Sequence, residues 1–453
     1  MIRRLLNIFR NNPTKGGARI IPRDRHNISR KLISRSALKV MKRLEEANHE
    51  AYLVGGGVRD LLLGGRPKDF DVATSATPEQ VKHLFRGARI IGRRFRIVHV
   101  RFGREIIEVT TFRGQHDDNS NRKHAARSDQ GMLLRDNVYG DVRSDALRRD
   151  FTVNALYYTA SDFSVHDYTR GMEDIVHRKV RMIGEPKARY QEDPVRMLRA
   201  VRFAAKLDFD IEPATAKPIR PMADLLRNIP AARLFDETLK LFMAGYAART
   251  LELLHEYDLL GHLIPAAAAA LDSDDQIGKQ LIIQAMHNTD HRIHSNKRVT
   301  PAFIFAALLW PVMTREQARL QAKGEHPIKA HQTAAQNIIS AQLSHTAIPK
   351  RFLQTTREIW DLQGRLPRRQ GKKAERVFEH PRFRAAYDFV LLREQAGENL
   401  GGLGDWWTRY QEVSFEEREA MVNQLQEPRG KKPRRRRRRK PTSTKTSHQT
   451  DAE

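Results

Sequence analysis

Hydrophobic and polar residues alternate with two different periods along the first third of the chain. From Ser34 to Asn48, apolar side chains recur at helical spacing, which predicts a helix that Ser34 or Ser36 can cap. The apolar run AYLV that follows predicts a buried strand, and the alternation in KDFDVATS predicts another. Strands and helices therefore alternate up to about residue 160, which predicts an α/β head.

Two further strand-like runs, ARIIGRRFRIVHVRF and REIIEVTTF, meet at Gly103. The segment before them, ATPEQVKHLF, predicts a helix with Thr77 as its cap and Pro78 at its first position. These elements complete the strands that we expect in the head.

Beyond about residue 174 the strand signals fade, and segments such as EDPVRMLRAVRFAAKL are amphipathic at helical spacing. The expected organisation has five parts. They are a basic N-terminal arm at 1–30 without clear periodicity, the α/β head at 31–170, a helical neck at 171–265, a helical body at 266–425, and an arginine-rich tail at 426–453 that we expect to be disordered.

The charge of the chain indicates a polyanionic partner. The formal net charge is +27 over 453 residues, and a protein this basic attracts phosphate backbones at long range. Part of the excess lies in one block, KKPRRRRRRK, at residues 431–440. Because no amphipathic helix accompanies this block, we favour nucleic acid over a membrane surface. No apolar run reaches the roughly eighteen residues of a membrane span, so we expect no membrane insertion.

Cysteine is absent from the sequence. Its absence excludes disulfides, thiol catalysis and zinc sites made of cysteine, so any metal must be held by oxygen or histidine. A chain without cysteine suits a reducing compartment, and we therefore expect a cytoplasmic protein.

The stretch GGGVRDLLLGGRPKDFDVATSAT places paired carboxylates shortly after a glycine-rich turn. On a strand, side chains alternate between faces, so Asp69 and Asp71 point the same way while Phe70 points into the core. Two carboxylates held this close repel each other unless a cation lies between them. Mg²⁺, which binds carboxylates and substrate phosphates, is the natural occupant, and a second ion would complete a two-metal site.

The glycine turn itself suits a phosphate ligand. Gly55, Gly56 and Gly57 let the backbone approach a ligand closely, and their N–H groups can line a triphosphate. They also open a helix whose N-terminus favours anions, with Arg59 on its first turn. The spacing matches neither a P-loop nor a dinucleotide fingerprint. Glycines, arginine and paired aspartates together indicate phosphoryl or nucleotidyl transfer.

A third carboxylate is expected to complete the metal site, and two residues are candidates. Glu108 lies on a strand that can neighbour the first pair, whereas Asp150 follows two arginines in RRDFTVNAL. For either residue the alternative is a salt bridge, and the residues alone leave the choice open.

Three segments in order, GGGVRDLLLGGRPKDFDVATSA, RRDFTVNALYY and RYQEDPVRMLRAVRFAAKL, resemble the signature motifs of the tRNA nucleotidyltransferase/poly(A) polymerase family. This family comprises class II nucleotidyltransferases of the polymerase-beta superfamily. The resemblance runs from about residue 35 to residue 265. It implies a polymerase-beta-like α/β head with a small mixed sheet, followed by an all-helical remainder. The segment IIGRRFRIVHV is similar to the stretch that marks the poly(A) polymerase branch, which the arginine-rich tail also suits.

The resemblance implies a role for residues in each motif. Asp69 and Asp71 match the metal-binding pair, and Asp150 matches the acidic residue counted with the catalytic set. The other two motifs supply the substrate contacts. Arg148, Arg149 and Asn154 match residues that contact the ribose and the triphosphate. Asp193 and Arg196 match residues that present a protein edge to the incoming base. The sequence DPVR also predicts a helix start with Asp193 as its cap.

The implied activity is template-independent addition of AMP from ATP to RNA 3′ ends by two-metal chemistry with Mg²⁺. The substrates expected from the resemblance are mRNA and small RNAs bound with little sequence preference, so that tailing promotes RNA decay, and RNA-decay proteins are expected partners. One alternative is a CCA-adding enzyme, which the IIGRRFRIVHV segment and the arginine tail disfavour. A second is a non-catalytic RNA-binding protein on a decayed head, which the intact Asp69, Asp71 and Asp150 disfavour.

Overall fold

The structure is a computed structural model of the chain. It describes residues 14–15, 17–92, 96–114, 125–127, 133–136 and 138–425. The chain forms two compact units. The first runs to Glu358 and includes Leu392–Glu398, and the second comprises Ile359–Leu391 and the chain from Asn399 onward.

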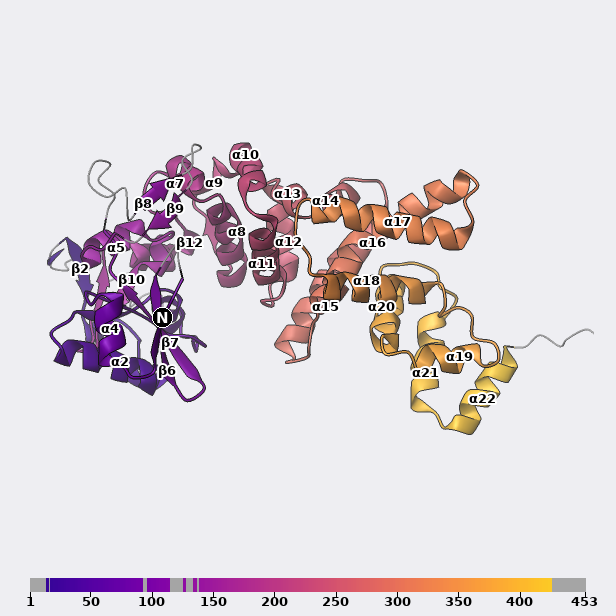
Figure 1. Ribbon diagram of the computed structural model, residues 1–453, viewed down its shortest axis with the longest axis horizontal. Helices are drawn as coiled ribbons and strands as arrows, with labels where there is room; N and C mark the ends of the chain where they lie inside the picture. The colour runs from indigo at the N-terminus through magenta and orange to yellow at the C-terminus, as the bar shows by residue number, and fades with distance from the viewer. Residues whose placement is uncertain are drawn as a thin grey trace, which may run out of the picture. The chain divides into compact units, whose positions relative to one another are not determined.

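A mixed sheet forms the head (Figure 1). Among the described residues it has nine strands in the order β1-β2-β11-β10-β3-β4-β7-β6-β5. Their bounds are β1 Thr14–Lys15, β2 Ala18–Ile21, β3 Ala51–Val54, β4 Asp71–Thr74, β5 Ala88–Ile91, β6 Ile97–Phe102, β7 Glu105–Thr111, β10 Leu156–Tyr158 and β11 Val165–Asp167. Within this sheet β4 and β7 pair in parallel and the other pairs are antiparallel. The predicted α/β head with a mixed sheet is confirmed.

Local signals position the helices of the head as the sequence predicts. The Ser34 hydroxyl accepts hydrogen bonds from the backbone of Ser36 and Ala37, so Ser34 caps α2 (Arg35–Glu46). At α4 (Pro78–Leu84), Thr77 and Gln80 form a reciprocal capping box. Gly103 has φ +59° in the turn between β6 and β7, a left-handed conformation that glycine adopts without strain.

The two faces of the sheet carry different helices. On one face, α2 packs against β3, β4 and β7, and α4 packs against β6 and β7. On the other face, Tyr52, Ala73 and Tyr157 form a buried cluster with Ala146 of α5 (Val142–Arg148). Ala73 lies two residues after Asp71 on β4, so Asp71 points to the α5 face.

The expected N-terminal arm at 1–30 is in part a strand. The four residues Ala18–Ile21 form β2, which pairs with β11 and extends the sheet. Ala18 and Ile21 are buried, and two buried residues three apart in so short a strand produce no recognisable period. This is why the hydrophobic pattern did not predict the strand.

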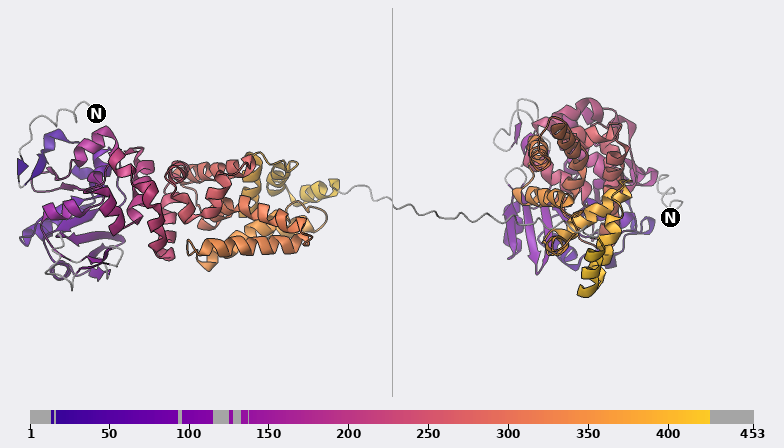
Figure 2. Two further views of the ribbon diagram at one scale, coloured as in Figure 1. Left: turned by 90° about the horizontal axis from the view of Figure 1, so that it is seen from above. Right: turned by 90° about the vertical axis from the view of Figure 1, so that its right-hand side faces the viewer.

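From α7 (Pro186–Glu192) onward the described chain is mostly helical (Figure 2), as predicted, with one short strand, β13 (Asp210–Ile211), paired to β12 (Lys179–Val180). The main helices are α8 Val195–Leu207, α11 Ala231–Phe242, α12 Ala247–Glu256, α15 Gln276–His294, α16 Pro301–Ala322, α17 Pro327–Leu343, α18 Lys350–Gln363 and α20 Phe383–Gln395. None of the helices in the described chain has the length and apolar character needed to cross a membrane.

The second unit has a core of its own. Trp407 of α21 (Leu403–Glu412) is fully buried there, and its indole Nε1 donates to the Leu366 carbonyl at 3.1 Å. α19 (Lys373–Phe378) and α22 (Phe415–Gln424) contribute Val377 and Val422 to the same core. The predicted tail at 426–453 lies outside the described residues.

Candidate active site

Asp71 and Glu108 lie directly opposite each other on the parallel strands β4 and β7. His99 of β6 is in turn opposite Glu108, and its Nε2 lies 3.4 Å from Oε1 of Glu108. Residues directly opposite in a sheet point to the same face, so all three side chains lie on the α5 face. Of the two candidates for a third carboxylate, Glu108 is therefore the strand neighbour of Asp71.

The carboxylates repel one another in this arrangement. Burial, followed by repulsion from Glu108, raises the pKa of Asp71 to about 6, against the opposing effect of Arg149, and Asp69 adds a smaller repulsion. Phe70 between the two aspartates is buried, as predicted. Asp69 is exposed and lies before β4, which begins at Asp71, so it is outside the strand on which the sequence predicted it. The cluster has the electrostatic character of a cation site.

The donor atoms of this cluster fit Mg²⁺. In the part of the chain that the structure describes, no three His, Asp or Glu side chains are grouped closely enough to enclose a metal ion. Mg²⁺ does not require such an enclosure, because it usually keeps several waters and binds through one or two carboxylates together with substrate phosphates. Asp69 and Asp71 supply that kind of ligand, on a half-open surface beside Glu108.

The glycine turn brings backbone up to the carboxylates. Gly55 follows β3 with φ +71°, and a Cβ there would lie 3.7 Å from both Oδ2 of Asp71 and Nη1 of Arg149. A Cβ on Gly57 would lie 3.4 Å from the Asp69 carbonyl oxygen. The left-handed φ makes Gly55 the position that requires glycine, and the turn places it between a carboxylate and a guanidinium.

Arg59 is an internal residue of the head, with 2% of its side chain exposed. Its guanidinium donates to Oδ1 of Asp60 at 2.6 and 2.8 Å and to Oδ1 of Asn154 at 2.5 Å. Lys206 of α8 donates to the second Asp60 oxygen at 3.1 Å. In the structure, Arg59 therefore fixes the position of the Asn154 side chain. A contact between Arg59 and the triphosphate stays a prediction.

The carboxylate of Asp150 is paired with α8. Nε of Arg199 donates to Oδ2 at 2.6 Å, while Oδ1 accepts from the Phe151 backbone at 2.9 Å and from Asn154 at 3.4 Å. Although burial works to raise it, the Arg199 guanidinium holds the pKa of Asp150 below its ordinary value. A salt bridge, the alternative considered for this residue, is what the structure shows. Its place in the catalytic set stays a prediction.

Asp145 and Tyr157 position Arg149, and the sequence interpretation had singled out neither of them. Oδ2 of Asp145 accepts from Nε and Nη2 of Arg149 at 3.2 and 3.1 Å and from the Tyr157 hydroxyl at 2.6 Å. The same hydroxyl accepts from Nε of Arg149 at 2.7 Å. The spacing of Asp145 and Arg149, four residues apart on a helix, was the one signal available for this pair.

Arg148 and the backbone that carries it are also fixed from two sides. The Arg148 guanidinium donates to the Gly114 carbonyl. From α7, Arg189 donates to the carbonyls of Arg148 and Arg149, each at 2.7 Å. Burial lowers the pKa of Arg189 to about 10. These contacts hold the RRD segment against α7 in the neck.

Asp193 and Arg196 are both held by neighbours. Oδ1 of Asp193 accepts from the Val195 backbone at 3.3 Å, at the start of α8, and Oδ2 accepts from Arg233 of α11 at 2.7 Å. Arg196 donates to Glu192 at 2.8 Å and to the Arg189 carbonyl at 2.7 Å. The sequence interpretation did not include Arg233, which no local pattern links to Asp193. The role of Asp193 and Arg196 at the base stays a prediction.

Comparison with known proteins decides the family of this chain. Family models match in three places: the poly A polymerase head domain at residues 51–181, the probable RNA- and SrmB-binding site of polymerase A at 208–271, and the polymerase A arginine-rich C-terminus at 323–441. The chain is 52% identical over 425 residues to poly(A) polymerase I of Escherichia coli O6:H1, covering 93% of this chain and 91% of that protein. The chain belongs to the poly(A) polymerase family.

Similarity to other members of the poly(A) polymerase family also spans nearly the whole chain. Poly(A) polymerase I of Haemophilus influenzae is 45% identical over 412 residues, which cover 90% of this chain and 91% of that protein. Among solved structures, the Bacillus stearothermophilus CCA-adding enzyme in complex with CTP aligns with a TM-score of 0.56 and 26% identity. That alignment covers 83% of this chain and 82% of the other. The family assignment confirms the predicted nucleotidyltransferase head.

Proposed function

We propose that this protein is a poly(A) polymerase that adds AMP from ATP to RNA 3′ ends without a template. The observation that carries the proposal is the 52% identity to a poly(A) polymerase I across 93% of the chain. The paired carboxylates of the head agree with it, because Asp69 and Asp71 are the expected metal ligands of such an enzyme.

In the proposed mechanism, Asp69 and Asp71 hold divalent ions, with Mg²⁺ the ion that best fits their donor atoms. When bound, such ions would lower the pKa of the terminal 3′-hydroxyl and offset the negative charge of the triphosphate. The hydroxyl attacks the α-phosphate in line and pyrophosphate leaves. No covalent intermediate with the protein is needed, so positioning and charge stabilisation account for the catalysis.

The other residues of the site orient the nucleotide. Arg149 lies next to Asp71 and is anchored by Asp145 and Tyr157, so it offers a fixed positive charge to the phosphates. Asn154 is held by Arg59 at the place proposed for the ribose. A fixed amide can select ATP over dATP, because a buried polar group left without the 2′-hydroxyl is costly.

Base selection is proposed for Asp193 and Arg196. Their partners Arg233, Glu192 and the Arg189 carbonyl limit how these two side chains can turn. A recognition edge that is already rigid loses little entropy on binding and tolerates few base shapes. We therefore propose that this edge accepts adenine.

The helical remainder is proposed to bind RNA. We assign base selection to the neck at 171–265 and backbone contacts to the body at 266–425. The match of residues 208–271 to a probable RNA-binding site supports RNA contact in the neck and at the start of the body. The excess of basic residues favours binding with little sequence preference and strong salt dependence. We further propose cytoplasmic action on mRNA and small RNAs with RNA-decay proteins as partners, and the lack of cysteine supports a reducing compartment.

Primer extension tests the proposed activity. Purified protein, Mg²⁺ and an RNA unrelated to tRNA are incubated with each ribonucleoside triphosphate in a separate tube. A long ladder with ATP alone is expected. Short additions confined to tRNA ends and needing CTP would instead show a CCA-adding enzyme, the activity of the structural relative. No extension in any tube would overturn the proposal.

A further inference from the structure

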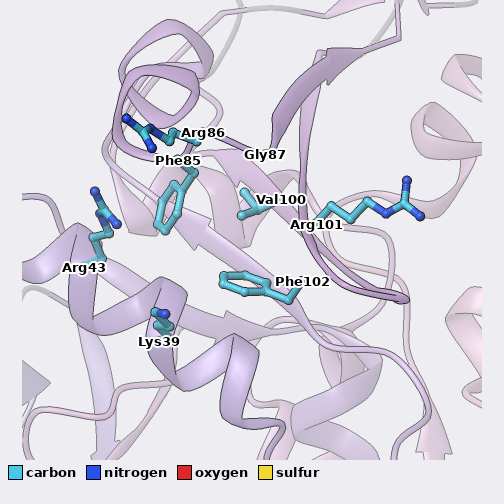
Figure 3. A pocket seen from close by; sticks show the side chains of 8 residues that line it. All are labelled: Lys39, Arg43, Phe85, Arg86, Gly87, Val100, Arg101 and Phe102. Atoms are coloured by element: carbon cyan, nitrogen blue, oxygen red, sulfur yellow. The ribbon is translucent and has the colours of Figure 1, made fainter.

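A hollow of about 380 Å³ lies in the head between α2, the end of α4 and β6 (Figure 3). Lys39 and Arg43 of α2 and Arg86 after α4 stand around it, and Phe85, Val100 and Phe102 lie among them. No aspartate or glutamate lines it. Its walls therefore combine apolar surface with positive charge alone.

Within the described residues, three of the four basic side chains that line this hollow have no acidic partner. Across the described chain, Lys39, Arg43 and Arg86 form no ion pair with a carboxylate. Nζ of Lys39 lies 5.8 Å from the ring centre of Phe102, and Cζ of Arg43 lies 5.4 Å from that of Phe85. A ring face orients a cation without neutralising it. The positive charge is therefore available to a ligand.

Arg101 also borders the hollow but takes no part in this cluster. In Figure 3 its side chain runs away from the other labelled residues. Its Nε donates to the Gly103 carbonyl at 2.8 Å. The charged cluster thus consists of Lys39, Arg43 and Arg86, all of them exposed.

The hollow is on the opposite face of the sheet from the carboxylates. Val100 follows His99 on β6, so the two side chains point to opposite faces. His99 is directly opposite Glu108, which is opposite Asp71, so these three share the α5 face. An occupant of the hollow therefore cannot be the nucleotide that reacts at Asp71.

We propose that this hollow is a second binding site for the RNA backbone, taking phosphodiester groups of a single strand at a distance from its reacting 3′ end. Three cations without acidic partners around this partly apolar hollow create a strong local positive potential, which favours binding of a polyanion. The hollow draws its cations from α2 and from the separate turn after α4, as a groove that follows a backbone does. The inference rests on the proposed function only in that RNA is the occupant.

A direct binding assay tests this site. Lys39→Gln, Arg43→Gln and Arg86→Gln are combined in one full-length variant, and affinity for a labelled unstructured RNA is measured by fluorescence anisotropy over a salt series without ATP. Loss of three phosphate contacts should reduce the slope of log K against log salt by about 2, at about 0.7 for each contact with a single strand. Affinity for an RNA of about 30 nucleotides should fall more than that for one of about 8, which cannot span both sites.

A matched control separates this site from general charge. Lys42→Gln, Lys82→Gln and Arg104→Gln remove three exposed cations from α2, α4 and the β6–β7 turn, none of which lines the hollow. The control is expected to keep the wild-type slope, and thermal melts should show both variants folded. Equal slopes for the two variants would overturn the site.

A competition experiment distinguishes RNA from a free phosphate ligand, which shares the same chemistry. Inorganic pyrophosphate at constant ionic strength should not displace the long RNA selectively from the wild type. If it removes as much affinity as the triple substitution does, the site belongs to small anions and the RNA assignment is overturned. AMP addition to the short primer is measured separately. If the proposed function is wrong, the wild type will add no AMP to this primer. If only the second site is wrong, AMP addition will be normal and the triple substitution will leave RNA binding unchanged.

Discussion

Asp71 and Glu108 face each other across two parallel strands, 37 positions apart in the chain but in direct register. Their repulsion adds to burial in raising the pKa of Asp71 to about 6. A fold retains such a pair at a cost in stability, which is common where a site must bind a cation. The first two predictions follow from this arrangement.

Asp69→Ala should abolish AMP addition. A bound metal supplies several kcal/mol of charge stabilisation in the transition state, so the rate should fall by at least about a hundredfold. Primer extension with ATP measures the rate, and RNA binding by the same variant serves as the control, since Asp69 is exposed and holds no RNA in the proposal. Intact AMP addition by the purified variant would show that the catalytic assignment is wrong.

Asp71→Asn should stabilise the metal-free protein. Because the folded-state pKa of Asp71 is raised to about 6, the free energy of unfolding contributed by this group is greatest below the unfolded pKa and is lost as pH rises through about 6. The loss amounts to up to about 3 kcal/mol at neutral pH. Asparagine carries no charge, so it should avoid this loss.

Urea unfolding of the wild type and Asp71→Asn in a chelator at several pH values measures the effect. The variant is expected to be the more stable above pH 6 and to lose that advantage below pH 4. Added Mg²⁺ should stabilise the wild type more than the variant, because it binds the ionised carboxylate. Equal stabilities at neutral pH in the chelator would contradict the prediction.

Glu108→Gln and Asp150→Asn should have opposite effects on stability. Glutamine removes a repulsion from Asp71, so Glu108→Gln should raise the free energy of unfolding. It also removes a candidate third metal ligand, so activity should fall. Asparagine at position 150 leaves the partly exposed Arg199 without its carboxylate, which should cost about 2 kcal/mol, less than the loss of a fully buried pair. Denaturation and steady-state rates measure both, and a double-mutant cycle with Arg199→Gln isolates the ion pair. A coupling energy near zero would show that the ion pair between Asp150 and Arg199 does not stabilise the protein.

Tyr157→Phe should raise the KM for ATP. The hydroxyl bonds both Asp145 and Arg149, and losing a hydrogen bond to a charged group costs about 1.5 kcal/mol or more, which is about tenfold in affinity. Tyr158→Phe is the matched control on the same strand, because the Tyr158 hydroxyl has no hydrogen-bond partner among the described residues. Steady-state kinetics distinguish them, and an equal KM change in both variants would show that Tyr157 does not act through Arg149.

Arg233→Met should weaken the preference for ATP over the other nucleotides. It releases Oδ2 of Asp193 and so frees the proposed recognition edge, which should reduce discrimination about tenfold. Arg227→Met provides the control, since its partner Asp224 belongs to an exposed pair that contributes little. The ratio of kcat/KM for ATP and CTP is the readout. An unchanged ratio in Arg233→Met would leave Asp193 without a role in specificity.

Local sequence patterns were sufficient to predict much of the fold and to propose candidate residues for the site. The caps at Ser34 and Thr77, the buried strand at Ala51–Val54 and the alternation around Phe70 depend on hydrogen bonds and side-chain directions within a few residues. Such contacts leave a pattern that can be read along the chain. The three motifs then placed Asp69 and Asp71 in a family whose membership the comparisons established.

Long-range pairing left no such pattern. Glu108 reached Asp71 through strand register, Asp150 met Arg199 across 49 residues, and Arg233 met Asp193 across 40. Strand β2 paired with β11 more than a hundred residues later, although its own pattern is too short to predict a strand. Periodicity specifies which face of an element is buried, whereas the partner of a charged side chain depends on which elements the folded chain brings together. For this reason the sequence predicted candidate residues for the site, and the folded structure determined which side chains those residues contact.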